Sequence, residues 1–111
     1  MSDVKQRQHY RLNYPEVYRP LLVVDVCDYE IEDISQYGLK FKVDDDLSFL
    51  IEDEILAVIT FPSGKEYELS GQVIRVDQGY VSVKLDTPLP LDLIKSESLH
   101  VHYHFPGMIS S

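Results

Sequence analysis

Short apolar runs separated by turn-forming groups run through most of this chain. The clearest pair covers residues 54–61 and 65–69, which flank the turn-forming tripeptide Pro62-Ser63-Gly64. In residues 39–43, apolar and basic side chains alternate, as they do in a strand with one face in a core and the other in solvent. Runs of this length with turn signals between them predict β-hairpins.

Apolar runs of strand length recur along the chain. Strand-like runs cover residues 21–27, 29–34, 39–43, 54–61, 65–69, 73–76 and 80–85. Gly71 marks a candidate β-bulge before residues 73–76, and Asp77-Gln78-Gly79 a turn before residues 80–85. Although seven runs are strand-like, we expect an all-β fold of six short antiparallel strands, either a barrel or a sandwich. Closure into a barrel would leave no unpaired edge for another chain.

Two polar clusters point to a guanine nucleotide as ligand. Arg7 and Arg11 lie four residues apart in the polar N-terminal segment. Each guanidinium can bind phosphate oxygens or the O6/N7 edge of guanine, and it can stack on a base. Asp33 accepts hydrogen bonds as guanine N1 and N2 require, and Ser35 would face the same way along a strand. Gly38 permits positive φ or a close approach of a ligand to the backbone.

This RxxxR segment followed by DxSxxG resembles the PilZ domain family. The resemblance implies a receptor for the bacterial second messenger cyclic di-GMP, with Arg7, Arg11, Asp33, Ser35 and Gly38 as ligand-binding residues. It also implies one domain spanning residues 1–111. A mobile ligand-binding arm would cover residues 1–15, a PilZ-like split β-barrel about 19–88, and a C-terminal segment about 91–104.

The same resemblance favours a short C-terminal helix over residues 91–100, although His100 to His104 also fits a strand. Many PilZ domains carry a further arginine beside the first motif arginine, whereas Gln6 and Gln8 flank Arg7 here. These two glutamines are additional candidate ligand contacts. Whether one nucleotide or a stacked pair binds is left open.

The resemblance implies a non-enzymatic output. Nucleotide binding would order the arm and alter binding of an effector protein from the flagellar, exopolysaccharide or pilus machinery, with effects on motility or biofilm formation. No cofactor besides the ligand is expected, and no catalytic residue is assigned. The rival hypotheses are a nucleotide-independent interaction domain with the same fold, and a nucleotide hydrolase. The second lacks any recognisable metal-ligand array or nucleophile–base pair.

Charge limits the class of partner. The chain has 19 acidic and 10 basic residues and a formal net charge of −9, which argues against a nucleic acid polymer as ligand. A small dianion needs only a local positive patch, which Lys5, Arg7 and Arg11 supply. The remaining acidic surface suits solubility.

Cys27 is the only cysteine, so no intramolecular disulfide can form and a reducing, cytoplasmic location is expected. We expect its side chain to be a small buried hydrophobe. No apolar run is long enough to span a bilayer, so membrane insertion is not expected. His100, His102 and His104 could share one face, but surface or half-buried imidazoles are the preferred interpretation and no metal site is assigned.

Overall fold

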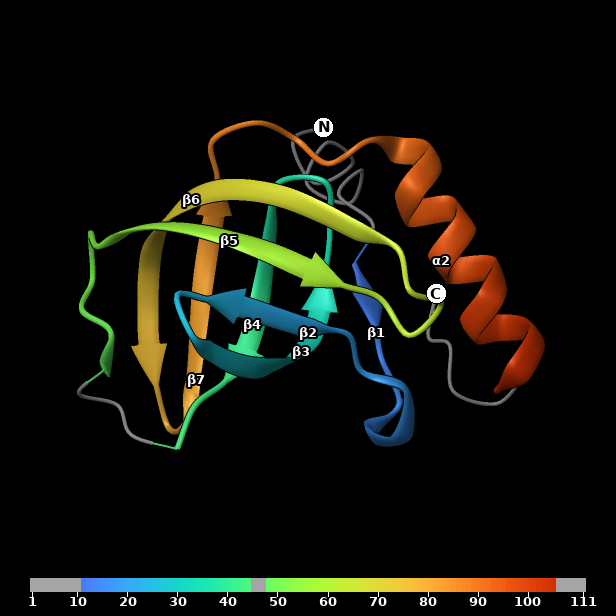
Figure 1. Cartoon of the computed structure of the whole chain (residues 1–111), viewed down its shortest axis with the longest axis horizontal. Helices are drawn as coiled ribbons and strands as arrows, with labels where there is room; N and C mark the ends of the chain where they lie inside the picture. The colour runs from blue at the N-terminus through green and yellow to red at the C-terminus, as the bar shows by residue number, and fades with distance from the viewer. Residues whose placement is uncertain (1–10, 45–47, 106–111) are drawn as a thin grey trace, which may run out of the picture.

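The computed structural model describes residues 11–44 and 48–105. It contains a closed antiparallel barrel of six strands, one additional short strand and a C-terminal helix (Figure 1). This confirms the predicted all-β barrel with a C-terminal helix. The barrel strands are β2 (Leu21–Val24), β3 (Cys27–Ile34), β4 (Gly38–Lys42), β5 (Glu54–Thr60), β6 (Glu66–Asp77) and β7 (Tyr80–Leu85).

Pairing between β3 and β4 closes the barrel. The strand order is β3-β2-β5-β6-β7-β4, and β4 pairs back to β3. The register joins Asp33 to Lys40 and Ile34 to Leu39, with an irregularity between Ile31 and Asp33. Every barrel strand therefore has two hydrogen-bonded neighbours, which removes the exposed edge of an open sheet.

The core fills the barrel with the side chains that alternation predicted. Leu39, Phe41 and Val43 are all buried, which confirms the inward face predicted for that run. Phe41 packs edge-on against Phe49, with ring centroids 5.2 Å apart, and Tyr29 contacts both rings. Aromatic side chains of this size bury large apolar areas, so this group forms a substantial part of the core.

Two predicted strands form one. Apart from Lys65, the predicted runs 65–69 and 73–76 both lie in β6, which runs without a break for 12 residues. The register shift lies between Val73 and Arg75, so the bulge predicted at Gly71 occurs further along the strand. Gly71 has a packing reason instead, since a Cβ there would lie 2.5 Å from the carbonyl oxygen of Lys84.

The last residues of the predicted arm are folded against the barrel. Leu12–Asn13 forms β1 and pairs with β3, and both Leu12 and Tyr14 are buried. Residues 12–15 therefore belong to the folded domain. A short 3-10 helix, η1 (Glu16–Tyr18), then leads into β2.

The C-terminal helix, α2 (Leu91–His104), includes the three histidines and is longer than predicted. It packs beside β1, outside the barrel (Figure 1). The hydroxyl of Tyr14 donates a hydrogen bond of 2.8 Å to the buried carboxylate of Glu97, and the ring of Tyr18 stacks on His100. The segment that follows Arg11 is thus held between barrel and helix. No helix in the described residues is long and apolar enough to cross a membrane.

Cys27 is exposed, so its predicted burial is wrong. It directly follows the two-residue turn that joins β2 to β3, where Asp25 has a φ of 56° and Val26 is 95% exposed. The three residues at the tip of this hairpin, Asp25, Val26 and Cys27, are therefore all exposed.

Glu97 should make stability depend on pH. Burial raises the pKa of Glu97, while the Tyr14 hydrogen bond and the nearby His100 and Lys65 act against this increase. The folded protein therefore holds the carboxyl proton more tightly than the unfolded chain. This contribution to stability is lost as the pH rises through the folded pKa.

We expect the wild type to gain stability relative to Glu97→Gln as the pH falls from about 8 to about 5. The amide oxygen of glutamine can still accept the Tyr14 hydrogen bond, so the comparison isolates the titration. Urea unfolding of both proteins across this range measures the difference. A difference in unfolding free energy that does not vary with pH would contradict the expectation.

Candidate functional site

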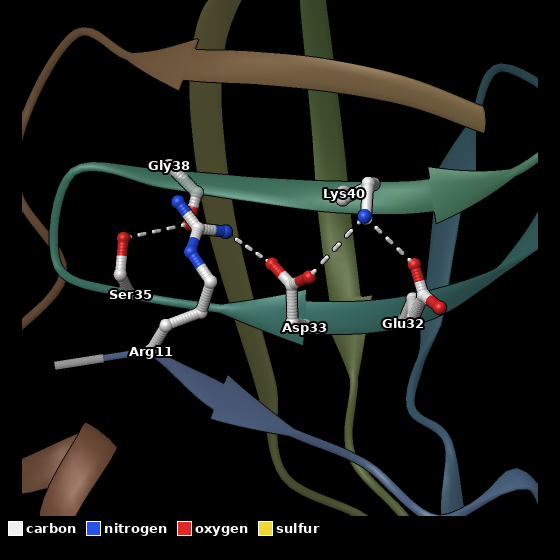
Figure 2. A network of polar contacts seen from close by, with 6 residues as sticks. All are labelled: Arg11, Glu32, Asp33, Ser35, Gly38 and Lys40. Carbon is white, nitrogen blue, oxygen red and sulfur yellow. Dashed lines mark hydrogen bonds and ion pairs between the residues drawn. The ribbon is translucent and has the colours of Figure 1, made fainter. Parts of the chain in front are cut away.

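Four of the five predicted motif residues lie around the turn that joins β3 to β4, namely Arg11, Asp33, Ser35 and Gly38 (Figure 2). Asp33 lies near the end of β3, Ser35 begins the turn and Gly38 begins β4. Two backbone amides from outside the hairpin hydrogen-bond to this turn. The Leu89 amide donates to the carbonyl of Gln36 at 2.7 Å, and the Leu85 amide donates to that of Tyr37 at 3.0 Å. The motif therefore lies on a fixed scaffold.

Arg11 and Asp33, 22 residues apart, form an ion pair between guanidinium Nη1 and carboxylate Oδ1. The strand β1 explains this contact, because Asn13 pairs with Asp33 and so Arg11 lies beside the end of β3. The carboxylate is nearly covered, with 4% of the side chain exposed, whereas the Arg11 side chain is 50% exposed. Arg11 therefore presents donors to solvent from a fixed position.

Lys40 is a third charged member that the sequence analysis missed as a site residue. Its ammonium lies 3.9 Å from Oδ2 of Asp33 and 3.1 Å from Oε1 of Glu32. Lys40 also lies over the ring of Tyr80, 5.4 Å from the centroid. The sequence could have indicated this contact, because a hairpin centred on the predicted turn at residues 35–38 pairs position 33 with position 40.

Burial and ion pairing have opposite effects on the pKa of Asp33. Burial raises the pKa of its carboxyl group, while Arg11 and Lys40 lower it. Burial is the larger effect, so the pKa stays above its ordinary value and the two cations offset only part of the loss of water around this carboxylate. An anionic ligand at the exposed side of Arg11 would meet a guanidinium whose orientation is already set by Asp33.

Ser35 has a local structural role. Its hydroxyl, on a side chain that is 2% exposed, donates to the carbonyl of Gly38 at 3.3 Å, and its amide donates to the same oxygen at 2.8 Å. These contacts fix the turn. The structure does not present the Ser35 hydroxyl to solvent.

Gly38 meets a steric requirement within the barrel, and the predicted positive φ is wrong, while the predicted approach of a ligand stays a prediction. The described glycines with positive φ are Gly64 and Gly79, so Gly38 needs no left-handed conformation. A Cβ on Gly38 would lie 2.8 Å from the carbonyl oxygen of Val83 on β7. The close approach is thus made by the neighbouring strand, and glycine permits β4 to pair with β7.

Three of the predicted site residues, Arg7, Gln6 and Gln8, lie outside the described residues. The histidines of α2 have a packing role at His100, which stacks on Tyr18 with ring centroids 5.2 Å apart. Within residues 11–44 and 48–105, no three His, Cys, Asp or Glu side chains are grouped as metal ligands would be.

A hollow of about 280 Å³ adjoins the ion pairs on the outer face of β4 and β7. It is lined by Lys40, Arg75, Asp77, Gln78, Tyr80 and Ser82. Lys40 connects this hollow to Asp33 and hence to Arg11. The site is therefore a partly exposed, charged surface on a rigid hairpin, and its half-exposed cation, Arg11, is the group that could bind an anion.

Comparison with known protein families identifies this arrangement. The model of the PilZ domain matches residues 5–100, which includes both polar clusters and every barrel strand. The chain belongs to the PilZ domain family. PilZ domains are binding and adaptor domains rather than enzymes, and membership suggests a cyclic di-GMP receptor or adaptor role. No curated protein matches this PilZ domain.

Solved structures support the PilZ fold. The Bacillus subtilis inhibitor of motility (MotI/DgrA) superposes with a TM-score of 0.65 at 14% identity, covering 93% of this chain and 52% of that one. The PilZ domain described here thus spans about half the length of that protein. An uncharacterized Legionella protein gives a TM-score of 0.53 at 19% identity and covers 86% of this chain and 92% of that one. At these identities the likeness shows the fold alone.

Removing Arg11 should raise the pKa of Asp33 further. In Arg11→Ala the carboxylate loses its hydrogen bond and its nearest cation, while the β3–β4 hairpin keeps it buried. The carboxyl carbon shift of Asp33, followed by NMR against pH, measures this change. Lys95→Ala, which removes an exposed cation on α2, is the control and should leave the titration unchanged. An unaltered Asp33 titration in Arg11→Ala would contradict the ion pair.

Adding one methyl group at Gly38 should loosen the barrel at β7. Gly38→Ala places a Cβ against a backbone oxygen that cannot rotate away, so the strands must separate slightly. We expect a loss of about 1–3 kcal/mol in the free energy of unfolding. Denaturant unfolding monitored by tyrosine fluorescence measures it, and an unchanged midpoint and slope would show that the β4–β7 contact is not tight.

Proposed function

We propose that this PilZ domain is a cytoplasmic receptor for cyclic di-GMP that signals to an effector protein. The observation that carries the proposal is the ion pair of a half-exposed Arg11 with a nearly buried Asp33. It joins the two polar clusters, which are far apart in the sequence. A guanidinium held in this way can bind phosphate or guanine with little loss of side-chain freedom.

The contacts suggest a division of roles. Arg11, with Arg7 from the preceding segment, would contact the nucleotide. Asp33 would orient Arg11 and, with Lys40, form the charged floor of the site. Ser35 and Gly38 would act through the backbone by fixing the turn and the β4–β7 approach.

The route to an output would pass through β1. Tyr14 lies three residues after Arg11 and is tied to Glu97 of α2. A nucleotide that binds Arg11 and orders the preceding arm would therefore favour one arrangement of the arm beside β1 and α2. Ligand affinity that differs between two arrangements is what shifts their populations. The effector would belong to flagellar, exopolysaccharide or pilus machinery, the kinds of target that the resemblance implies.

Isothermal titration calorimetry with cyclic di-GMP tests the proposal. The wild type should give saturable heat, and the titration also gives the number of nucleotides per chain. Arg7→Ala, Arg11→Ala and Asp33→Ala should each weaken binding about tenfold or more, because each removes a charged hydrogen-bonding group or its support. GMP serves as the ligand control.

Lys95→Ala serves as the protein control, since it removes a cation on the exposed side of α2. It should bind cyclic di-GMP like the wild type. Absence of heat with the wild type at high micromolar nucleotide would contradict the proposal and favour a nucleotide-independent interaction domain. Equal binding by Arg11→Ala and the wild type would contradict the assigned site.

A further inference from the structure

An apolar stripe lies on the outer surface of the barrel, away from the motif residues. It consists of Leu21 and Val23 on β2 and Leu56 and Val58 on β5. Leu56 is 79% exposed and Leu21 36%, while the two valines are half-buried. Contiguous aliphatic groups on a solvent-facing sheet are unusual in a monomer unless they bind something.

The strand register makes these four side chains neighbours. Val23 pairs directly with Val58, and Leu21 pairs with Thr60. The residues between them along each strand, Leu22 and Ala57, are buried in the core, so the stripe residues face outward. A hollow of about 370 Å³ lies at one end of the stripe, with Val23, Leu56 and Val58 among its lining residues. The strands β2 and β5 lie at the front of the barrel in Figure 1.

Acidic side chains border the stripe on both sides. On β3, Glu30 pairs with Leu21 and Asp28 with Val23. On β6, Glu66 pairs with Thr60 and Glu68 with Val58. All four carboxylates are exposed.

Cations among the described residues lie near the border on β3 but form no ion pair with the border on β6. Arg19 pairs with Glu30 across 3.4 Å, and Lys42 adjoins Asp28 and Glu30 around a separate hollow. Neither reaches Glu66 or Glu68 in any ion pair of the described chain. The surface is thus a hydrophobic strip between two acidic borders, and the border on β6 is the more negative.

The spacing of the borders indicates the shape of a partner. Four adjacent strands separate the two acidic rows by three strand spacings, about 14 Å in all. An α-helix with its side chains is about 10–12 Å across. A helix lying along the stripe would place its apolar face on the aliphatic groups. Long basic side chains on either side would reach the carboxylates, as lysine and arginine do when their stems cover apolar surface.

We propose that the outer face of β2 and β5 is a docking surface for a basic amphipathic helix of a partner protein. The acidic borders disfavour the two other occupants of an apolar face. An anionic membrane would be repelled, and so would a second copy of this chain, which carries the same borders and a net charge of −9. The proposal does not rest on nucleotide binding, because the stripe shares no residue with the site around Arg11 and Asp33.

The test uses a designed peptide in place of the unidentified partner. The probe is a capped helical peptide of about 16 residues, long enough to form a helix, with leucines along one face and lysines on both sides. A second peptide keeps the leucines and carries glutamates in place of the lysines. Fluorescence anisotropy without cyclic di-GMP gives the affinity, and amide shifts in two-dimensional NMR locate the contact.

We expect the basic peptide to bind, to shift amides of β2 and β5, and to weaken with added salt, while the acidic peptide does not bind. Leu56→Lys should weaken binding about tenfold or more, as loss of a central anchor does. Glu66→Gln with Glu68→Gln should weaken binding and reduce its salt dependence. Leu99→Lys is the matched control, because Leu99 is 70% exposed on α2, and it should bind like the wild type.

Three outcomes would overturn the proposal. The basic peptide fails to bind, or it binds Leu56→Lys as it binds the wild type, or its amide shifts fall outside β2 and β5. A fourth outcome that would overturn it comes from sedimentation of the protein alone. A dimer that Leu56→Lys dissociates would show that the stripe binds a second copy. Because no nucleotide is present, each result is independent of the calorimetric test of cyclic di-GMP binding.

Discussion

The pairing of β3 with three other strands is the constraint on which the rest of the structure depends. With β2 and β4 it closes the barrel, and with β1 it brings Arg11 beside Asp33. The irregularity between Ile31 and Asp33 changes the alternation, so that Ile31, Asp33 and Ile34 are all buried. A carboxylate in that position needs cations nearby, and both come from the paired strands or their immediate flanks.

Patterns that extend over neighbouring residues were predictable from the sequence. The hairpins and the inward face of residues 39–43 depend on alternation and turn chemistry, which are local. Leu12 and Tyr14 were placed in a mobile arm because two apolar residues in a polar segment show no period. Their burial depends on β3 and on Glu97, 83 residues from Tyr14. Helix and strand both fit His100 to His104 locally, and contact with Tyr18 accompanies the helix.

Local sequence patterns were also insufficient to predict the whole candidate site. Residue types and spacing indicated Arg11 and Asp33, but only the register reveals that Lys40 approaches the same carboxylate. The distinction between Arg11, half-exposed, and Ser35, buried in the turn, depends on packing that no local pattern contains. The binding and supporting roles within one motif therefore require the three-dimensional structure. The same strand β3 contributes carboxylates to both the candidate site and the border of the apolar stripe, on separate stretches of its length.

The exposed position of Cys27 has a practical consequence. It is the single thiol of the chain, it lies at the tip of the β2–β3 hairpin, and it directly precedes the acidic border formed by Asp28 and Glu30. A maleimide dye or a nitroxide would therefore attach at one defined point without any engineered substitution. Such a label would lie beside the stripe and away from Arg11, so its signal would distinguish occupancy of one surface from occupancy of the other.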